Sequence, residues 1–179
     1  MKSRFGVPIL LLAAFGSACD RVVAPDAGQI ESSPAPALAH ASTPTSAAGT
    51  FTQTAIRSLA VRVAGRNTII EQTSEGSISG TLTGNFDDRL KVVIHPNGTF
   101  TARFTITCEC TVGGREGVLE IVAGDRGRLV APDLATFAGR AVITGATDEL
   151  AGLRGVLRIE GTVDIPSGLS SYTYSGEIH

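Results

Sequence analysis

Two cysteines separated by a single residue are the first side chains in this chain that could do chemistry. Cys108 and Cys110 flank Glu109, and a Gly-Gly pair follows them. Such a pair could ligate a soft metal, act as a redox switch, form a structural disulfide or lie as inert thiols in a core. On a regular strand their α-carbons would be roughly 6.6 Å apart, so a disulfide requires a bulge or a distorted strand. All four alternatives stay open, although two ligands without a nearby histidine make a metal site a weak one.

A third cysteine lies at the end of an N-terminal export signal. Lys2 and Arg4 precede an almost wholly apolar run, and three small residues lead into Cys19. This pattern predicts that residues 1–18 are a secretory signal peptide, because the run is too short for a membrane-spanning helix. Small residues before a cysteine also resemble the lipobox of bacterial lipoproteins, although Gly16 stands where that motif prefers leucine. We therefore expect Cys19 to be the site of lipid attachment, and the alternative is ordinary cleavage that releases a soluble secreted protein.

The residues after the signal predict a tether on the outside of a membrane. Segment 19–50 is rich in Ala, Pro, Ser and Thr and has no sustained apolar period, so we expect a flexible linker. Loss of Lys2 and Arg4 with the signal leaves 13 basic against 17 acidic residues, a net charge of about −4. A mildly acidic, exported chain is not a nucleic-acid-binding protein. The expected location is the bacterial cell envelope, with the membrane contacted only through the lipid, and no feature indicates an oligomeric state.

Segment 51–179 has the texture of an all-β domain. Short alternating runs rich in β-branched residues, glycine and threonine are separated by turn signals about every ten residues. The strands are expected at 55–63, 67–73, 76–86, 88–95, 99–112, 115–123, 135–146, 154–165 and 170–178. Only 131–134 and 147–153 look non-β, the second as a single helical turn. Closure of these strands into an antiparallel up-and-down barrel of about eight strands would remove exposed edges.

Turn residues predict how neighbouring strands pair. A three-residue loop ending in Gly98 sets Leu90 opposite Phe104, so that the apolar residues of both strands share one face. A Gly113–Gly114 turn sets Cys108 opposite Leu119, which points both sulfurs into the core. The same reasoning predicts a hairpin that turns near Asp87 and Asp88, which sets Leu82 opposite Val92 and Gly84 opposite Leu90. In the C-terminal hairpin it sets Val163 opposite Tyr172 and Gly161 opposite Tyr174.

These registers predict an interior without charge. The acidic residues that we place on turns or on the outward face are Asp87, Asp88, Glu109, Glu116, Glu120, Glu160 and Asp164. General acid and base catalysis needs a titratable group inside a pocket, so we predict no catalytic residue, no cofactor and no metal ion. The hydroxyls of Tyr172 and Tyr174 are the polar groups expected inside, and with Phe100 and Phe104 they are the candidate lining of a ligand cavity.

Segment 137–165 resembles one known group of barrels. Thr144–Thr147 and Leu150–Leu153 are similar to turns that recur in small bacterial secreted proteins related to allene oxide cyclase, with Asp148 and Glu149 departing from the pattern. The resemblance implies an eight-stranded antiparallel barrel over about 50–179, and most bacterial members have no known function. Allene oxide cyclase itself cyclises a fatty-acid epoxide in its cavity, but its polar residues match no position here.

Three functions follow as hypotheses. The first is an envelope-anchored barrel that binds a small apolar molecule in its interior or contacts another envelope component. The second is an isomerase or cyclase resembling allene oxide cyclase, which requires a carboxylate or a comparable group inside the barrel. The third is a structural surface domain without a ligand.

Overall fold

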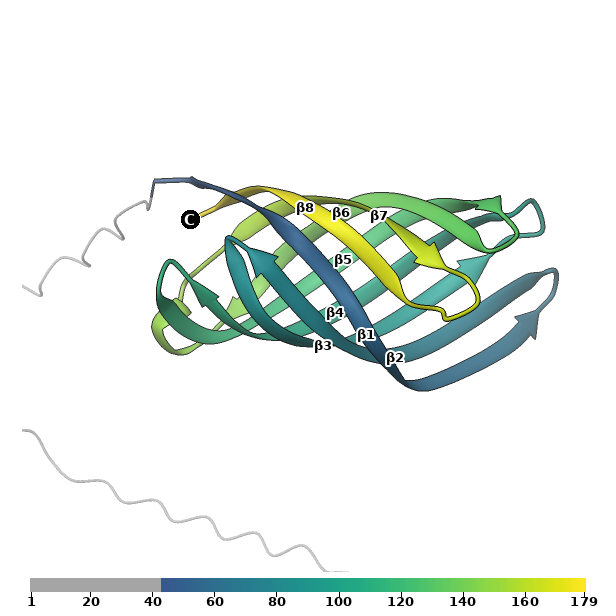
Figure 1. The fold of residues 1–179 in the computed structure, drawn as a ribbon, viewed down its shortest axis with the longest axis horizontal. Helices are drawn as coiled ribbons and strands as arrows, with labels where there is room; N and C mark the ends of the chain where they lie inside the picture. The colour runs from purple at the N-terminus through teal and green to yellow at the C-terminus, as the bar shows by residue number, and fades with distance from the viewer. Residues whose placement is uncertain (1–42) are drawn as a thin grey trace, which may run out of the picture. The chain divides into compact units, whose positions relative to one another are not determined.

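Eight antiparallel strands close into a barrel in the order of the chain (Figure 1). The computed structural model describes residues 43–179, so the predicted signal peptide, Cys19 and most of the predicted tether lie outside the described residues. The strands are β1 (Thr45–Ala64), β2 (Asn67–Gly80), β3 (Leu82–Ile94), β4 (Thr99–Val112), β5 (Arg115–Ala131), β6 (Leu134–Ala146), β7 (Gly155–Asp164) and β8 (Ser170–Ile178). The expected all-β, up-and-down barrel is confirmed, and the expected helical turn is η1 (Asp148–Leu150). No helix within the described residues is both long and apolar enough to cross a membrane.

The barrel domain begins earlier than predicted. Residues 45–50 were expected to belong to the tether, but they form the first part of β1 and pair with both β2 and β8. Their side chains alternate between the two faces of the sheet, as in a strand, and Ala47 and Phe51 point inward and are each only 1% exposed. Gly49 lies against the ring of Tyr174, where a β-carbon would come within 2.6 Å of the hydroxyl oxygen. Small residues that look like a linker are therefore the closing strand of the barrel.

The second hairpin turns at a different place from the one predicted. Ile78 pairs with Gly84, and the chain reverses at Gly80 and the residue after it, where Gly80 has a φ of 110°. Asp87 and Asp88 consequently lie in the middle of β3 and not on a turn, so the predicted pairs of Leu82 and Gly84 are wrong. Two adjacent acidic residues are typical of a turn, but here they lie within a strand, whose side chains point alternately to the two faces. Asp87 therefore points outward and Asp88 inward.

Two other hairpins are as predicted, and the last one is displaced. Leu90 lies opposite Phe104 and Cys108 opposite Leu119, as the glycine turns require. In the C-terminal hairpin Gly161 faces Tyr172, so the predicted register of β7 and β8 is wrong by two residues. The loop is longer than expected because the Asp164 carboxylate accepts the backbone N–H of Ser167 at 3.0 Å, which makes a wide turn.

The interior of the barrel is solid at one end. Leu82, Leu119 and Leu157 are completely buried there, and Leu150 of η1 covers the opening from outside the sheet. The disulfide between Cys108 and Cys110 belongs to this packed end. Its two α-carbons are 5.3 Å apart, closer than in a regular strand, and both residues are buried. The remaining space inside the barrel is therefore concentrated at the opposite end.

We predict that the start of β1 is a structural part of the barrel. Ala47→Asp should lower the free energy of unfolding by about 3 kcal/mol, because it places a carboxylate in an apolar core. Ala48→Asp, one residue later on the exposed face, is the matched control and should change it by less than about 0.5 kcal/mol. Urea denaturation of both variants measures the difference, and equal stabilities would mean that residues 45–50 are a tether after all.

Candidate functional site

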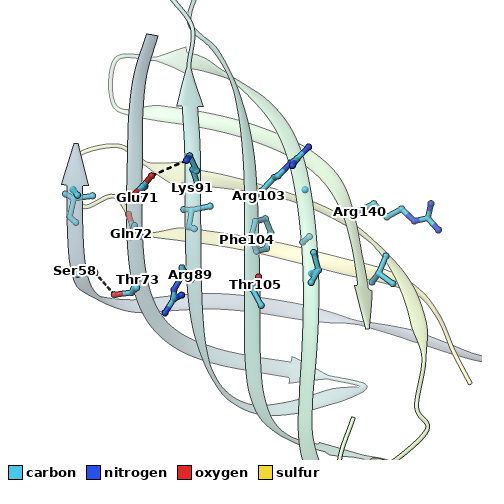
Figure 2. Close-up of a pocket in the computed structure, with 17 residues that line it drawn as sticks. Ser58, Glu71, Gln72, Thr73, Arg89, Lys91, Arg103, Phe104, Thr105 and Arg140 are labelled. Carbon is cyan, nitrogen blue, oxygen red and sulfur yellow. Dashed lines mark hydrogen bonds and ion pairs between the residues drawn. The ribbon is translucent and has the colours of Figure 1, made fainter. Parts of the chain in front are cut away.

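The open end of the barrel holds an apolar cavity of about 270 Å³. Its wall is mostly aliphatic and aromatic, and its polar groups come from β1, β2, β3, β5 and β8. The residues on this wall include Gln53, Ile70, Gln72, Asp88, Leu90, Val92, Ile94, Phe100, Ala102, Phe104, Asp125, Leu129, Ala135, Phe137, Val163, Ile165, Gly168, Ser170 and Tyr172. A separate, open groove on the outer face of β1–β6 has a charged lining (Figure 2). The interior cavity has the composition of a ligand site, in which apolar walls surround a few polar groups.

Three of the four predicted lining residues are on the cavity wall. Phe100, Phe104 and Tyr172 contact the hollow space, and Tyr174 does not. The hydroxyl of Tyr174 lies toward the packed end, where it accepts the backbone N–H of Leu82 at 2.8 Å. Tyr174 is therefore a structural residue, and Tyr172 is the tyrosine that faces the cavity.

Tyr172 is held by aromatic contacts on several sides. Its ring stacks on Phe51 with centroids 4.9 Å apart, and Phe137 meets it edge-on at 5.7 Å. Gly161 lies opposite on β7 and leaves room for the ring, since a β-carbon there would lie 2.3 Å from the Tyr172 β-carbon. No hydrogen-bond partner for the Tyr172 hydroxyl lies within the described chain. Burial, together with the charges of Asp88 and Asp125, raises the pKa of this phenol well above its usual value, so it stays protonated at neutral pH and can donate a hydrogen bond.

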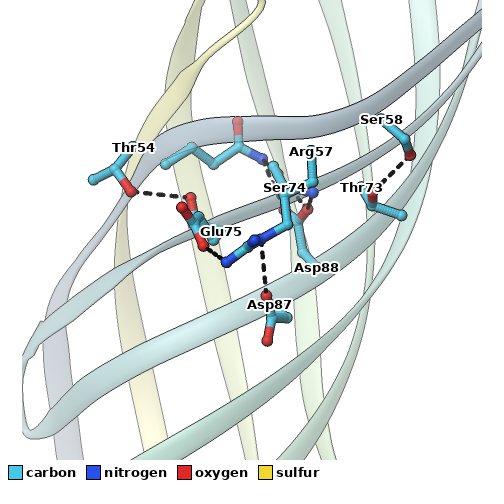
Figure 3. Close-up of polar contacts among 9 residues, drawn as sticks. Thr54, Arg57, Ser58, Thr73, Ser74, Glu75, Asp87 and Asp88 are labelled. Atoms are coloured by element: carbon cyan, nitrogen blue, oxygen red, sulfur yellow. Dashed lines mark hydrogen bonds and ion pairs between the residues drawn. The ribbon is translucent and has the colours of Figure 1, made fainter.

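Asp88 is buried but fully engaged with its neighbours (Figure 3). Gln53 donates its amide N–H to the carboxylate at 2.7 Å, and Ser74 donates both its backbone N–H, at 3.1 Å, and its hydroxyl. The oxygen of the same Gln53 amide accepts the backbone N–H of Ser170 at 2.9 Å, just beyond the last β1–β8 pair. Burial raises the pKa of Asp88, and these hydrogen bonds oppose the rise. Asp88 thus ties β1, β2 and β3 together, and this network joins β8 as well.

Asp125 is buried without such support. It lies on β5 between Ala102 and Gly139, and a β-carbon on Gly139 would come within 2.6 Å of the Asp125 side chain. Its Oδ1 atom has no hydrogen-bond partner in the part of the chain that the structure describes. Burial raises the pKa of Asp125 to about 6, with a smaller opposing contribution from the backbone of Ala102. This carboxyl group therefore exchanges its proton close to neutral pH, as general acids and bases in enzymes do.

The cavity contains one further unpaired polar group. The amide nitrogen Nε2 of Gln72, on β2, is buried and finds no acceptor among residues 43–179. Buried polar atoms without partners are rare in folded proteins, and each requires an explanation. The three residues that carry an unpaired amide nitrogen, carboxyl oxygen and phenol hydroxyl all belong to the wall of the same cavity. Each of the three is a buried group for which the described residues supply no partner, on the wall of a cavity large enough for a small molecule.

The prediction of an uncharged interior is therefore wrong at two positions. Asp88 is inward because the hairpin turns at Gly80 and not near Asp87, and Asp125 is absent from the predicted list of acidic residues. The predicted β4–β5 register is correct, and it would have identified Asp125. Two residues beyond the pair of Phe104 and Ala123, the same register pairs Asp125 with Ala102, which faces inward. No cluster of three or more His, Cys, Asp or Glu side chains in the described residues is arranged to hold a metal ion.

Comparisons with known proteins give a likeness of fold. No model of a protein family matches the chain, and no curated protein sequence matches it. Among solved structures, the pterocarpan synthase dirigent protein GePTS1 is similar, with 12% identity, a TM-score of 0.48, and coverage of 86% of this chain and 98% of that one. The pterocarpan synthase dirigent protein PsPTS1 is similar with 12% identity, a TM-score of 0.46, and coverage of 76% and 95%.

Proposed function

We propose that the barrel binds one small, mainly apolar molecule that carries an oxygen-containing group. The observation that supports this proposal is that three residues on the wall of a mainly apolar cavity, Gln72, Asp125 and Tyr172, each carry a buried polar atom without a partner among the described residues. The amide and the phenol are donors that suit a carbonyl or ether oxygen of the ligand. The carboxylate, when ionised, accepts from a ligand hydroxyl. An aliphatic or aromatic body would occupy the rest of the cavity.

The size of the cavity limits the ligand. At about 270 Å³ it is just below the 300–1,000 Å³ range, roughly, of most small-molecule sites. Leu129 and Ile165 line it and are 45% and 41% exposed, so the cavity reaches the surface at this end of the barrel. A ligand of one or two fused rings, or a short branched chain, would fit without unfolding the barrel.

The proposed setting is the bacterial cell envelope. We propose that export removes residues 1–18 and that a lipid on Cys19 holds the domain at a membrane, with secretion as a soluble protein as the alternative. Support comes from the sequence alone, namely the basic start, the apolar run and the small residues before the cysteine. In this setting the ligand would be an apolar molecule of the envelope.

We predict that 2-naphthol binds in the cavity more tightly than naphthalene. One added hydrogen bond to a buried partner corresponds to about a fivefold difference in Kd. Val163→Phe should weaken binding of both by about tenfold or more, because the larger ring enters the cavity from its wall. Val156→Phe, on the exposed face of the same strand, is the matched control and should leave binding unchanged. Fluorescence titration measures the affinity of both ligands for the unaltered protein and for the two variants, and an absence of binding to the unaltered protein would favour a ligand-free structural domain.

A second candidate function is proton transfer, as in an isomerase or cyclase. The observation that favours it is that Asp125, with a pKa of about 6, and the phenol of Tyr172 belong to the wall of the same cavity. In such a reaction Asp125 would take a proton from a carbon next to a carbonyl group. Tyr172 would donate a hydrogen bond to the oxygen on which negative charge develops. The proton would then return from Asp125 to carbon.

This candidate predicts that the protein catalyses deuterium exchange at the α-carbon of 2-tetralone in heavy water. The catalysed rate should rise as the pH increases through about 6, because only ionised Asp125 can act as a base. Asp125→Asn should lower the rate by about a hundredfold or to the uncatalysed level, whereas Asp87→Asn, on the outward face of β3, should not change it. Nuclear magnetic resonance follows the exchange, and equal rates in both variants would exclude Asp125 as the base.

A further inference from the structure

The outer groove crosses six neighbouring strands, β1 to β6, at about the same height along the barrel. Each of β1 to β6 contributes two outward-facing residues to it, so the groove runs across the strands and around the barrel (Figure 2). Its volume is about 1060 Å³. The outward-facing residues are Ser58, Ala60, Glu71, Thr73, Arg89, Lys91, Arg103, Thr105, Val122, Gly124, Arg140 and Val142. This groove is distinct from the interior cavity, which faces the other side of the sheet.

A row of cations follows this groove. Lys91 lies directly opposite Arg103, and Arg140 lies directly opposite Arg158 on the next strand. Gly124 separates the two pairs, since it is the cross-strand partner of both Arg103 and Arg140. With strands about 4.8 Å apart, the part of the row inside the groove, from Lys91 on β3 to Arg140 on β6, extends over about 14 Å, and Arg158 on β7 continues it beyond the groove. Like charges in directly opposed positions are destabilising by themselves, so folding alone does not account for the row.

Most of these cations are not neutralised by the protein. Lys91 bonds Glu71 at 3.2 Å, and Arg62 approaches the same carboxylate at 3.9 Å. No carboxylate among residues 43–179 lies within 4.0 Å of Arg103 or Arg140. Figure 2 shows the Arg140 side chain extending away from the strands. In a chain whose formal net charge is −2, the groove is a local concentration of unpaired positive charge.

We propose that this groove binds a linear acidic polysaccharide. A chain-like polyanion can follow a row of cations around the curved barrel, whereas a flat membrane surface would meet only part of it. The aromatic residue of the lining is Phe104, which is 7% exposed and faces the interior. The groove therefore offers no exposed aromatic ring on which nucleic-acid bases could stack. Gly124 leaves an open gap between Arg103 and Arg140, where a sugar ring could lie close to the backbone.

The proposal is tested by binding of fluorescein-labelled alginate fragments to the full chain at low ionic strength. Alginate should bind, neutral dextran should not, and affinity should fall as salt screens the charges. The double variant Arg103→Glu with Arg140→Glu should weaken binding by about tenfold or more. Arg66→Glu with Arg115→Glu is the matched control, because it changes the net charge equally at exposed positions outside the groove, and it should stay within about twofold.

Several outcomes would overturn the proposal. Equal weakening by both double variants would mean that net charge and not the groove attracts the polymer. Unchanged binding in the groove variant would place the polymer elsewhere. Tighter binding to single-stranded oligothymidine, or to vesicles of phosphatidylglycerol and phosphatidylcholine, would assign the groove to a nucleic acid or a membrane. Binding of 2-naphthol in the groove variant reports separately on the interior cavity, so failure of one proposal is distinguishable from failure of the other.

Discussion

The structure depends on the pairing of its first strand with its last. β1 contacts β8 along residues 45–52, and this contact converts an open sheet into a closed barrel. Apart from Phe51, the part of β1 that closes the barrel consists of small residues, because large aromatic rings from β8 fill the space beneath it. Gly49 accommodates Tyr174, and Phe51 stacks on Tyr172. Beyond Thr52 the two strands separate, and the side chain of Gln53 replaces the missing backbone pairing.

Closure also determines where the interior is filled and where it is hollow. At one end leucines, the disulfide and the η1 segment leave no space. At the other end the cavity retains two carboxyl groups with different roles. Both carboxylate oxygens of Asp88 accept hydrogen bonds from neighbouring strands, which holds these strands together. Asp125, in contrast, has an unpaired oxygen and a pKa of about 6. An unpaired buried carboxyl group lowers stability, and such a group is expected where function and not folding determines the residue.

The sequence predicts much of this architecture, for identifiable reasons. Gly98 and Gly113–Gly114 have positive φ angles and mark turns clearly, so the registers around them follow at once. The start of β1 could not be recognised, because its composition is that of a linker and only its partners make it a strand. The carboxyl groups required more than local pattern: Asp88 is tolerated inside because Gln53 and Ser74 reach it from neighbouring strands, and their contact is a property of the closed barrel.

The carboxyl group of Asp125 is buried on the cavity wall, and one of its oxygens has no hydrogen-bond partner among the described residues. Carbon-13 nuclear magnetic resonance of the aspartate side-chain carboxyls, assigned with Asp125→Asn, measures its titration directly. We expect a midpoint of about 6 for Asp125, separated from the exposed carboxyls. A midpoint of about 4, the ordinary value for aspartate, would contradict it, because the carboxyl group would then be solvated or paired and the cavity would lack its reactive group.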